Sequence, residues 1–135
     1  MNYWIVKSDP ETFGWSELVK EKKTDWTGVR NYAARIHLKA MKKGDKVLFY
    51  HSNQGLAIVG IAKVTKEFFQ DSTAKDEAWV AVELTAIKEL KNAVSLSEMK
   101  TKKELSNIGL IKIGRLSVMP ITKAVYDIII KMGKK

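Results

Sequence analysis

Residues 26–53, "WTGVRNYAARIHLKAMKKGDKVLFYHSN", combine a helical pattern with the strand pattern that follows it. Within residues 31–43 the apolar side chains recur at the spacing of one helix face, and these are Ala34, Leu38 and Met41. Gly44 is expected to end this helix. Residues 47–52 then form an apolar run that predicts a strand, and this strand ends in Tyr, His and Ser. The stretch therefore predicts a basic helix that leads directly into a buried strand.

Patterns of the same two kinds continue on both sides of this stretch. Further strands are predicted at 3–7, 56–65, 79–90 and 114–121, with a hairpin turn at the "NQG" of residues 53–55. Helices are predicted at 94–105 and 122–131, and a shorter one at 16–22. Because 135 residues is the usual size of one compact unit, we expect a single domain over 1–135. The expected fold is mainly β (α+β): a small mixed barrel with about three peripheral helices.

The charge balance indicates a polyanionic partner. The chain carries 24 Lys and Arg against 15 Asp and Glu, which gives a net charge of +9. Such an excess favours nucleic acid, although an acidic protein or a membrane surface would also attract it. The chain has no cysteine and no apolar run of membrane-spanning length, and its start lacks the pattern of a secretory signal. We therefore expect an intracellular protein without disulfides, located in the cytoplasm or, if the source is a eukaryote, alternatively in the nucleus.

Several kinds of chemistry lack their sequence patterns. Two histidines, His37 and His51, do not build a zinc site without carboxylates, and no phosphate-binding glycine motif is present. The sequence thus predicts neither a metal nor a cofactor. The remaining enzyme alternative is a small nuclease or base-processing hydrolase in which His51 works with Asp71 or Glu67. A second alternative is a protein-interaction module that uses the basic helix.

The aromatic residues favour recognition over catalysis. Trp26 stands in a polar loop between Asp25 and Thr27, where no helix or strand periodicity predicts its burial. A stacking role for this indole and a core role are therefore equally supported. We expect the other three tryptophans, at positions 4, 15 and 79, to lie in the core.

Four sequence blocks together resemble one known family. "WTGVRNYAAR" at 26–35, "VKSDP" at 6–10, "GDKVLFYHSN" at 44–53 and "GRLSVMPI" at 114–121 closely resemble the EVE domain. The resemblance implies a PUA-like pseudobarrel, related to the YTH and ASCH domains. It also implies a non-enzymatic protein with a pocket that takes a single modified base from single-stranded or base-flipped DNA or RNA. We expect the protein to be a monomer.

The resemblance also implies which residues form the site. For the base-binding pocket it points to Lys7, Ser8, Trp26, Asn31, Tyr32, Tyr50, His51, Ser52, Asn53 and Ser117. In such a pocket aromatic rings stack on the base, while amide and hydroxyl groups pair with its polar edge. The backbone phosphates would then contact Arg30, Arg35, Lys39, Lys42 and Arg115. Alternatively, Asn31 only caps the helix that follows it, and Arg30 and Arg35 pair with acidic neighbours.

The chain departs from the family pattern at two positions. Asp9 stands where relatives commonly have Glu, and Ala33 stands where they commonly have Gln. If that glutamine reads a base edge in the relatives, base choice differs in this protein.

Overall fold

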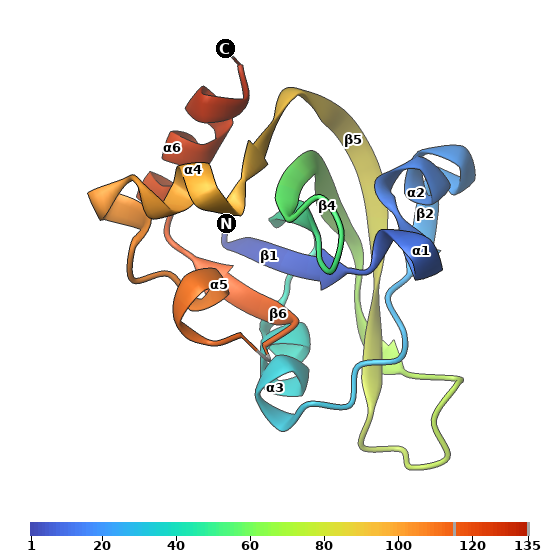
Figure 1. Ribbon diagram of the computed structural model, residues 1–135. Coiled ribbons are helices and arrows are strands. Elements are labelled where there is room, and N and C mark those ends of the chain that lie inside the picture. Colours follow the sequence, from blue (N-terminus) through green and yellow to red (C-terminus); the bar gives the residue numbers. More distant parts are fainter. Residues whose placement is uncertain (115, 135) are drawn as a thin grey trace.

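The architecture is one mixed sheet with helices packed around it, seen in a computed structural model that describes residues 1–114 and 116–134 (Figure 1). The strands are β1 (Tyr3–Ser8), β2 (Lys23–Asp25), β3 (Lys46–His51), β4 (Ala57–Gln70), β5 (Val80–Ser95) and β6 (Val118–Ile121). The helices are α1 (Pro10–Phe13), α2 (Trp15–Glu21), α3 (Tyr32–Ala40), α4 (Leu96–Lys100), α5 (Gly109–Lys112) and α6 (Lys123–Gly133), with a 3-10 turn η1 (Lys103–Leu105).

The six strands form a single sheet in the order β2-β5-β4-β3-β1-β6. Strands β1 and β3 pair in parallel, because α1, α2, β2 and α3 form a crossover between them, and the other strand pairs of the described residues are antiparallel. The long β4–β5 ladder shifts register at several points, and such bulges bend and twist the strands that carry them. The sheet is therefore strongly curved, as the sweep of β5 in Figure 1 shows. The expected mainly β fold with peripheral helices is confirmed.

Helix α3 begins where the sequence predicts but ends three residues earlier. Asn31 caps its first turn, because its Oδ1 accepts a hydrogen bond from the Ala34 amide at 3.0 Å. The helix stops at Ala40 because Met41 takes an extended conformation and is fully buried. The Lys42 amide then donates to the buried Asp45 carboxylate instead of continuing the helical ladder.

Other predicted boundaries differ for similar reasons. The helix predicted over 94–105 is wrong in its first part, because Val94 and Ser95 pair with β4 as the end of β5. Only Leu96–Lys100 and η1 are helical there. Among the described residues of the predicted strand 114–121, the strand that pairs with β1 is Val118–Ile121. Helices α1 and α5 and strand β2 were not predicted at all, since each has only three or four residues.

The core is rich in aromatic side chains on the inner face of the sheet. The ring of Phe49 in β3 lies 5.6 Å from both Trp15 and Trp26, centroid to centroid, in edge-on contacts. Trp15 also lies directly on Gly60, where an added Cβ would come within 2.5 Å of its ring. Gly60 is therefore required by the close approach of this indole. Within the described residues no helix is long and apolar enough to cross a membrane.

Candidate functional site

A pocket of about 570 Å³ opens at the carboxyl end of β1, and we call it the Trp26 pocket. Its walls come from β1, α1, β2, the loop between β2 and α3, and the residue before β6. The lining residues are Lys7, Ser8, Asp9, Thr12, Phe13, Thr24, Asp25, Trp26, Thr27, Gly28, Val29, Arg30, Asn31 and Ser117. Its volume lies in the range of small-molecule sites, which leaves ample room for one base.

Trp26 serves both the core and the pocket. Its side chain is only 8% exposed and contacts Phe13 and Phe49 edge-on, and its backbone amide donates to the Val82 carbonyl at 2.7 Å. The two roles considered for this tryptophan therefore coexist, because one part of the ring packs inward while the residue lines the pocket. Phe13 provides a second aromatic side chain in the same wall.

The pocket loop, residues 26–31, is held in place by Asp71 at the end of β4. The Asp71 carboxylate is fully buried and accepts hydrogen bonds from the Gly28 amide at 2.8 Å and from Arg30 at 3.0 Å. It also accepts from the amide and hydroxyl of Thr73. Burial raises the pKa of Asp71, but these hydrogen bonds outweigh it and lower the pKa to about 2. Asp71 is therefore a charged anchor for the loop at neutral pH.

Gly28 allows the loop to turn toward that anchor. Its backbone φ is +83°, a conformation that side chains of L-residues rarely adopt. This turn aims the Gly28 amide at the Asp71 carboxylate and leaves Thr27 and Val29 in the pocket wall. In Figure 1 the loop runs from β2 down to α3 beside the β4–β5 hairpin.

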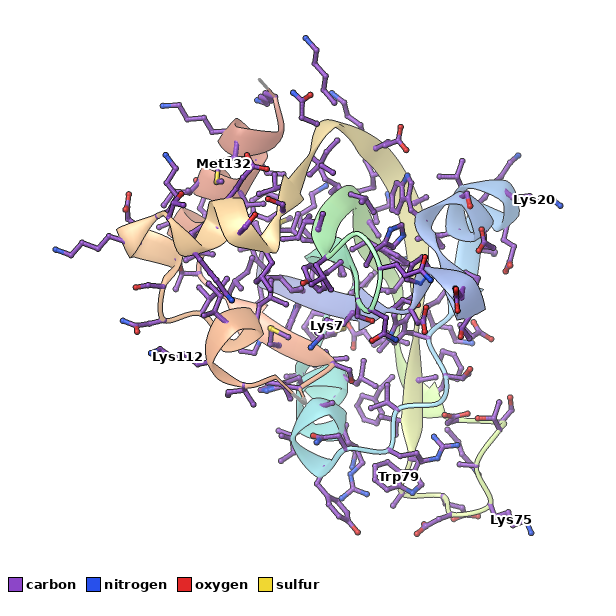
Figure 2. The ribbon with its side chains drawn as sticks, in the orientation of Figure 1. Lys7, Lys20, Lys75, Trp79, Lys112 and Met132 are labelled. Atoms are coloured by element: carbon purple, nitrogen blue, oxygen red, sulfur yellow. The ribbon has the colours of Figure 1, made fainter. Side chains whose placement is uncertain are left out.

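The β1 side of the pocket is formed by Lys7 and Ser8. The Lys7 ammonium donates to the Gly114 carbonyl at 2.9 Å, and burial lowers the pKa of this lysine. Its side chain points away from β1 toward the β6 side of the molecule (Figure 2). The Ser8 hydroxyl donates to the Phe13 carbonyl and is thus engaged in holding α1. Ser117 faces the same pocket, and its carbonyl accepts from the Lys7 amide.

Asn31 both caps α3 and lines the pocket. Its side-chain oxygen is engaged by the Ala34 amide, so the capping role considered for it is observed. The amide NH₂ of the same side chain has no hydrogen-bond partner among the described residues. The Asn31 side chain can therefore offer both N–H donors to a ligand in the pocket, and its oxygen keeps a second lone pair besides the one that accepts from the Ala34 amide.

Three other predicted base-binding residues line a different, smaller cavity, which we call the Tyr50 pocket. It has a volume of about 310 Å³ and is lined by Lys7, Tyr50, Ser52, Asn53, Leu56, Leu96, Lys100, Leu110, Ile111 and Gly114. Tyr50 is almost fully buried, and the Asn53 amide donates to Asp9 at 2.8 Å. Lys7 lines both pockets, so the predicted set divides between two cavities that share one lysine.

His51 lies in neither pocket. Its Nε2 accepts a hydrogen bond from the Trp15 amide at 3.0 Å and so caps the start of α2. Burial lowers the pKa of His51 more than the nearby Glu17 carboxylate raises it. Its strand position pairs with Ala57 at the start of β4, whereas Asp71 follows the end of that long strand. The pairing of His51 with Asp71 considered for a hydrolase is therefore not formed.

The residues predicted to contact phosphates differ in whether their charged groups are already engaged within the protein. Arg30 forms an ion pair with Asp71 at 3.0 Å and lines the Trp26 pocket, and Lys42 lies 3.8 Å from Glu67. Lys39 is exposed on α3. Arg35 donates to the Ala78 carbonyl at 3.3 Å rather than to an acidic neighbour. Arg115 lies outside the described residues.

Tyr32 and Trp79 form an aromatic pair beside the pocket, not part of its wall. Their ring centroids lie 5.4 Å apart, and Tyr32 is 68% exposed. The expectation that Trp79 belongs to the core is wrong: it is half-buried and directly precedes β5, where the chain enters the sheet again (Figure 2). Trp4 and Trp15 are buried as expected.

Sequence reasoning missed several residues of this site. Phe13, Thr24 and Thr27 line the Trp26 pocket, and Asp71 anchors its loop. Thr24 and Thr27 flank the predicted tryptophan, so the sequence "TDWT" was a usable signal. The contact of Asp71 with Gly28 spans 43 residues, and no local pattern indicates it.

Comparisons with known proteins agree on one family. A family model described as "EVE domain" matches residues 2–132. Thymocyte nuclear protein 1 of Mus musculus is 33% identical, over 97% of this chain and 73% of the relative. The solved structure of protein Atu2648 from Agrobacterium tumefaciens is 43% identical, with a TM-score of 0.95, over 98% of this chain and 93% of the other.

Two further solved structures contain nucleic acid. Human THYN1 protein, in complex with 5-methylcytosine containing DNA, is 29% identical with a TM-score of 0.94, and the match covers 100% of this chain and 99% of that one. The YTH domain of Zygosaccharomyces rouxii MRB1 protein, in complex with N6-methyladenosine RNA, is 13% identical with a TM-score of 0.64, over 99% and 87%. The latter likeness is one of fold alone, and it confirms the PUA-like architecture. The chain belongs to the EVE domain family.

Proposed function

We propose that this protein is a reader of nucleic acid that accepts one modified base in the Trp26 pocket. The observation that carries the proposal is the pocket itself, which combines aromatic walls with unengaged polar groups. Trp26 and Phe13 supply the rings, and the Asn31 amide supplies donors for a base edge. The human relative solved with 5-methylcytosine DNA supports the same class of ligand.

The charge of the molecule supports a nucleic acid as the carrier of that base. The net charge of +9 is spread over the chain, and cationic side chains stand at the pocket rim and along α3. In this proposal Lys7, Arg30 and Lys39 contact the phosphates on either side of an extruded base. The chain, as one EVE domain over 1–135, would bind as a monomer inside the cell, in the cytoplasm.

The mode of action we propose is binding without turnover. The Asp71 carboxylate stays charged at neutral pH and is fully engaged by the loop, so it is a poor general acid. The ring nitrogen of His51 that faces α2 is occupied by the Trp15 amide. Incubation with a modified oligonucleotide should therefore leave it unchanged, and release of a base or a shorter product would overturn this part of the proposal.

Titration calorimetry with matched oligonucleotides tests the proposal. The strands differ only in one base: cytosine, 5-methylcytosine, 5-hydroxymethylcytosine, adenine or N6-methyladenine. Burial of one methyl group gives about 0.8 kcal/mol, roughly fourfold in affinity. An unpaired polar group in the pocket adds about 1–3 kcal/mol against the wrong base. We expect at least about tenfold preference for one modified base. Equal affinities across the panel would contradict the proposal.

Two variants identify the pocket that takes the base. Asn31→Ala removes the free amide of the Trp26 pocket, whereas Ser52→Ala removes a hydroxyl from the Tyr50 pocket. We expect the first to weaken binding of the modified strand and the second to leave it unchanged. The opposite result would indicate that the base binds in the Tyr50 pocket. If the protein binds acidic peptides and no oligonucleotide, a protein-interaction module is favoured instead.

A further inference from the structure

The most exposed aromatic ring beside the Trp26 pocket belongs to Tyr32. It is the first residue of α3, and 68% of it is open to solvent. Stacking of a flat ligand on this open ring would remove a large apolar area from water. The ring is not needed to complete the core, which lies on the other side of α3 at Ala34 and Leu38.

The ring is held in a defined place by its neighbours. The Arg35 guanidinium lies 5.0 Å from the centroid of Tyr32 and 4.8 Å from that of Trp79. The planes of Tyr32 and Trp79 are tilted by only 34°. Arg35 also donates to the Ala78 carbonyl, which fixes the guanidinium against the β4–β5 hairpin. Tyr32, Arg35 and Trp79 thus form an ordered platform of flat groups, which we call the Tyr32 platform.

This platform continues the wall of the Trp26 pocket. Asn31 lines the pocket and directly precedes Tyr32 in the chain. Arg30 lines the pocket as well, and its guanidinium lies 5.8 Å from the centroid of Trp79. Arg30 therefore lies at the pocket rim and also contacts the Trp79 ring of the platform. A strand that places one base in the pocket passes over this arginine to reach the platform.

We propose that the Tyr32 platform is a second nucleotide subsite, on which the base adjacent to the modified one stacks. The inference rests on the proposed function, because it assumes that the Trp26 pocket holds the modified base. Stacking on an aromatic face suits any base, since each has a flat π surface. The adjacent arginines Arg30 and Arg35 match the phosphate that joins the two nucleotides. The platform thus contributes affinity without sequence preference.

A purely structural role accounts for part of this cluster but not for Tyr32. Arg35 and Trp79 connect α3 to the hairpin through the Ala78 carbonyl and a cation–π contact. Tyr32 packs against the outer side of that connection, on Trp79 and Arg35, and is 68% exposed. Its removal should therefore leave the fold intact, while its ring is what a flanking base would contact.

Trinucleotides with a modified base at the centre test the inference. Each is prepared with both neighbours present, and with an abasic sugar in place of the 5′ or the 3′ neighbour. The probes carry 5-methylcytosine or N6-methyladenine, and each has an unmodified counterpart. For the unaltered protein we expect an abasic neighbour on one side to weaken binding about fivefold or more, the lower end of base–aromatic stacking. An abasic sugar on the other side should have little effect.

Variants of Tyr32 then test whether the loss of affinity caused by the abasic neighbour depends on the Tyr32 ring. Tyr32→Ala should weaken binding of the complete trinucleotide by the same factor and remove the difference between it and its abasic version. Tyr32→Phe keeps the ring and should retain both the affinity and the difference. Thermal denaturation of both variants should match that of the unaltered protein. If Tyr32→Ala binds all probes as the unaltered protein does, or if the abasic neighbours have no effect, the platform is not a subsite.

The preference for the modified over the unmodified centre separates the two proposals. If that preference persists in Tyr32→Ala while the abasic difference disappears, both are supported. If the preference is present but no neighbour matters, only the second subsite is overturned. If the unaltered protein shows no preference for any modified centre, the proposed function fails first, whatever the neighbours do.

Discussion

Trp26 is the residue whose role the structure changes most. An isolated tryptophan in a polar loop suggests a surface indole, and its removal would then leave the fold unaffected. The side chain is instead 8% exposed and packs on Phe13 and Phe49. The loop is polar because its backbone turns outward to form the pocket, while the indole points inward. Sequence periodicity does not predict such burial, since loops have no repeating side-chain direction.

We therefore predict that Trp26→Ala destabilises the protein. Truncation of a buried tryptophan costs about 3–5 kcal/mol, because it removes apolar contacts and leaves a cavity. Denaturant unfolding measures the loss, and Val19→Ala, at an exposed position of α2, serves as the control. A Trp26→Ala protein as stable as the control would mean that the indole is not part of the core.

Asp71 should make stability depend on pH in the acid range. Its pKa is about 2 in the folded protein against an ordinary value of 3.8. Because the folded value is the lower one, the contribution is fully present above about pH 4 and is lost as the pH falls toward 2. The shift corresponds to about 2 kcal/mol. Asp71→Asn should lose this dependence in acid unfolding curves, whereas Asp76→Asn, in the same hairpin tip, should retain it.

At the scale of elements, α3 is where fold and site meet. The helix was predicted from the spacing of Ala34, Leu38 and Met41, and the first two of these lie on its buried face. Its first turn carries the Asn31 cap in the pocket wall and Tyr32 on the platform. The position of the site at this helix start was thus accessible from the sequence, because capping and apolar spacing are local signals.

Two substitutions separate the roles of Asn31. Asn31→Asp keeps an oxygen for the Ala34 amide but replaces the free NH₂ with a negative charge, so stability should be preserved and oligonucleotide binding lost. Asn31→Ala should lose both, at a cost of about 1 kcal/mol in stability. Thermal denaturation and titration calorimetry measure the two effects. Full binding by Asn31→Asp would show that this amide does not read the base.

Other elements could not be predicted so well. The strands β4 and β5 are longer than their alternating patterns suggest, because bulges interrupt the alternation while the pairing continues. Helices α1 and α5 and strand β2 are too short to show a period. The division of the predicted residues between two pockets also has no local signal, since it depends on how β1 and β3 lie in the sheet.

For the whole molecule, the net charge of +9 determines how binding depends on salt. The pocket takes one base, so only a few phosphates can approach its cationic rim. We predict that two to four counterions are released, which corresponds to a slope of roughly −1.4 to −2.8 for a single strand in a plot of log K against log salt. Titrations between low and physiological salt measure the slope. A flat dependence would mean that the phosphates make no contact.

The contact between Asp71 and the pocket loop joins two segments into one unit of local unfolding. The hairpin tip at 71–79 has little apolar packing of its own, so its backbone amides are expected to exchange hydrogen readily with solvent. The Gly28 amide and the Arg30 guanidinium both donate to the Asp71 carboxylate. A ligand that restrains the 26–31 loop therefore also restrains the tip. A ligand in the Trp26 pocket should therefore slow amide exchange at Thr73 and Ala74, residues that do not line the pocket. Hydrogen exchange at the tip thus reports on the occupancy of a pocket that it does not touch.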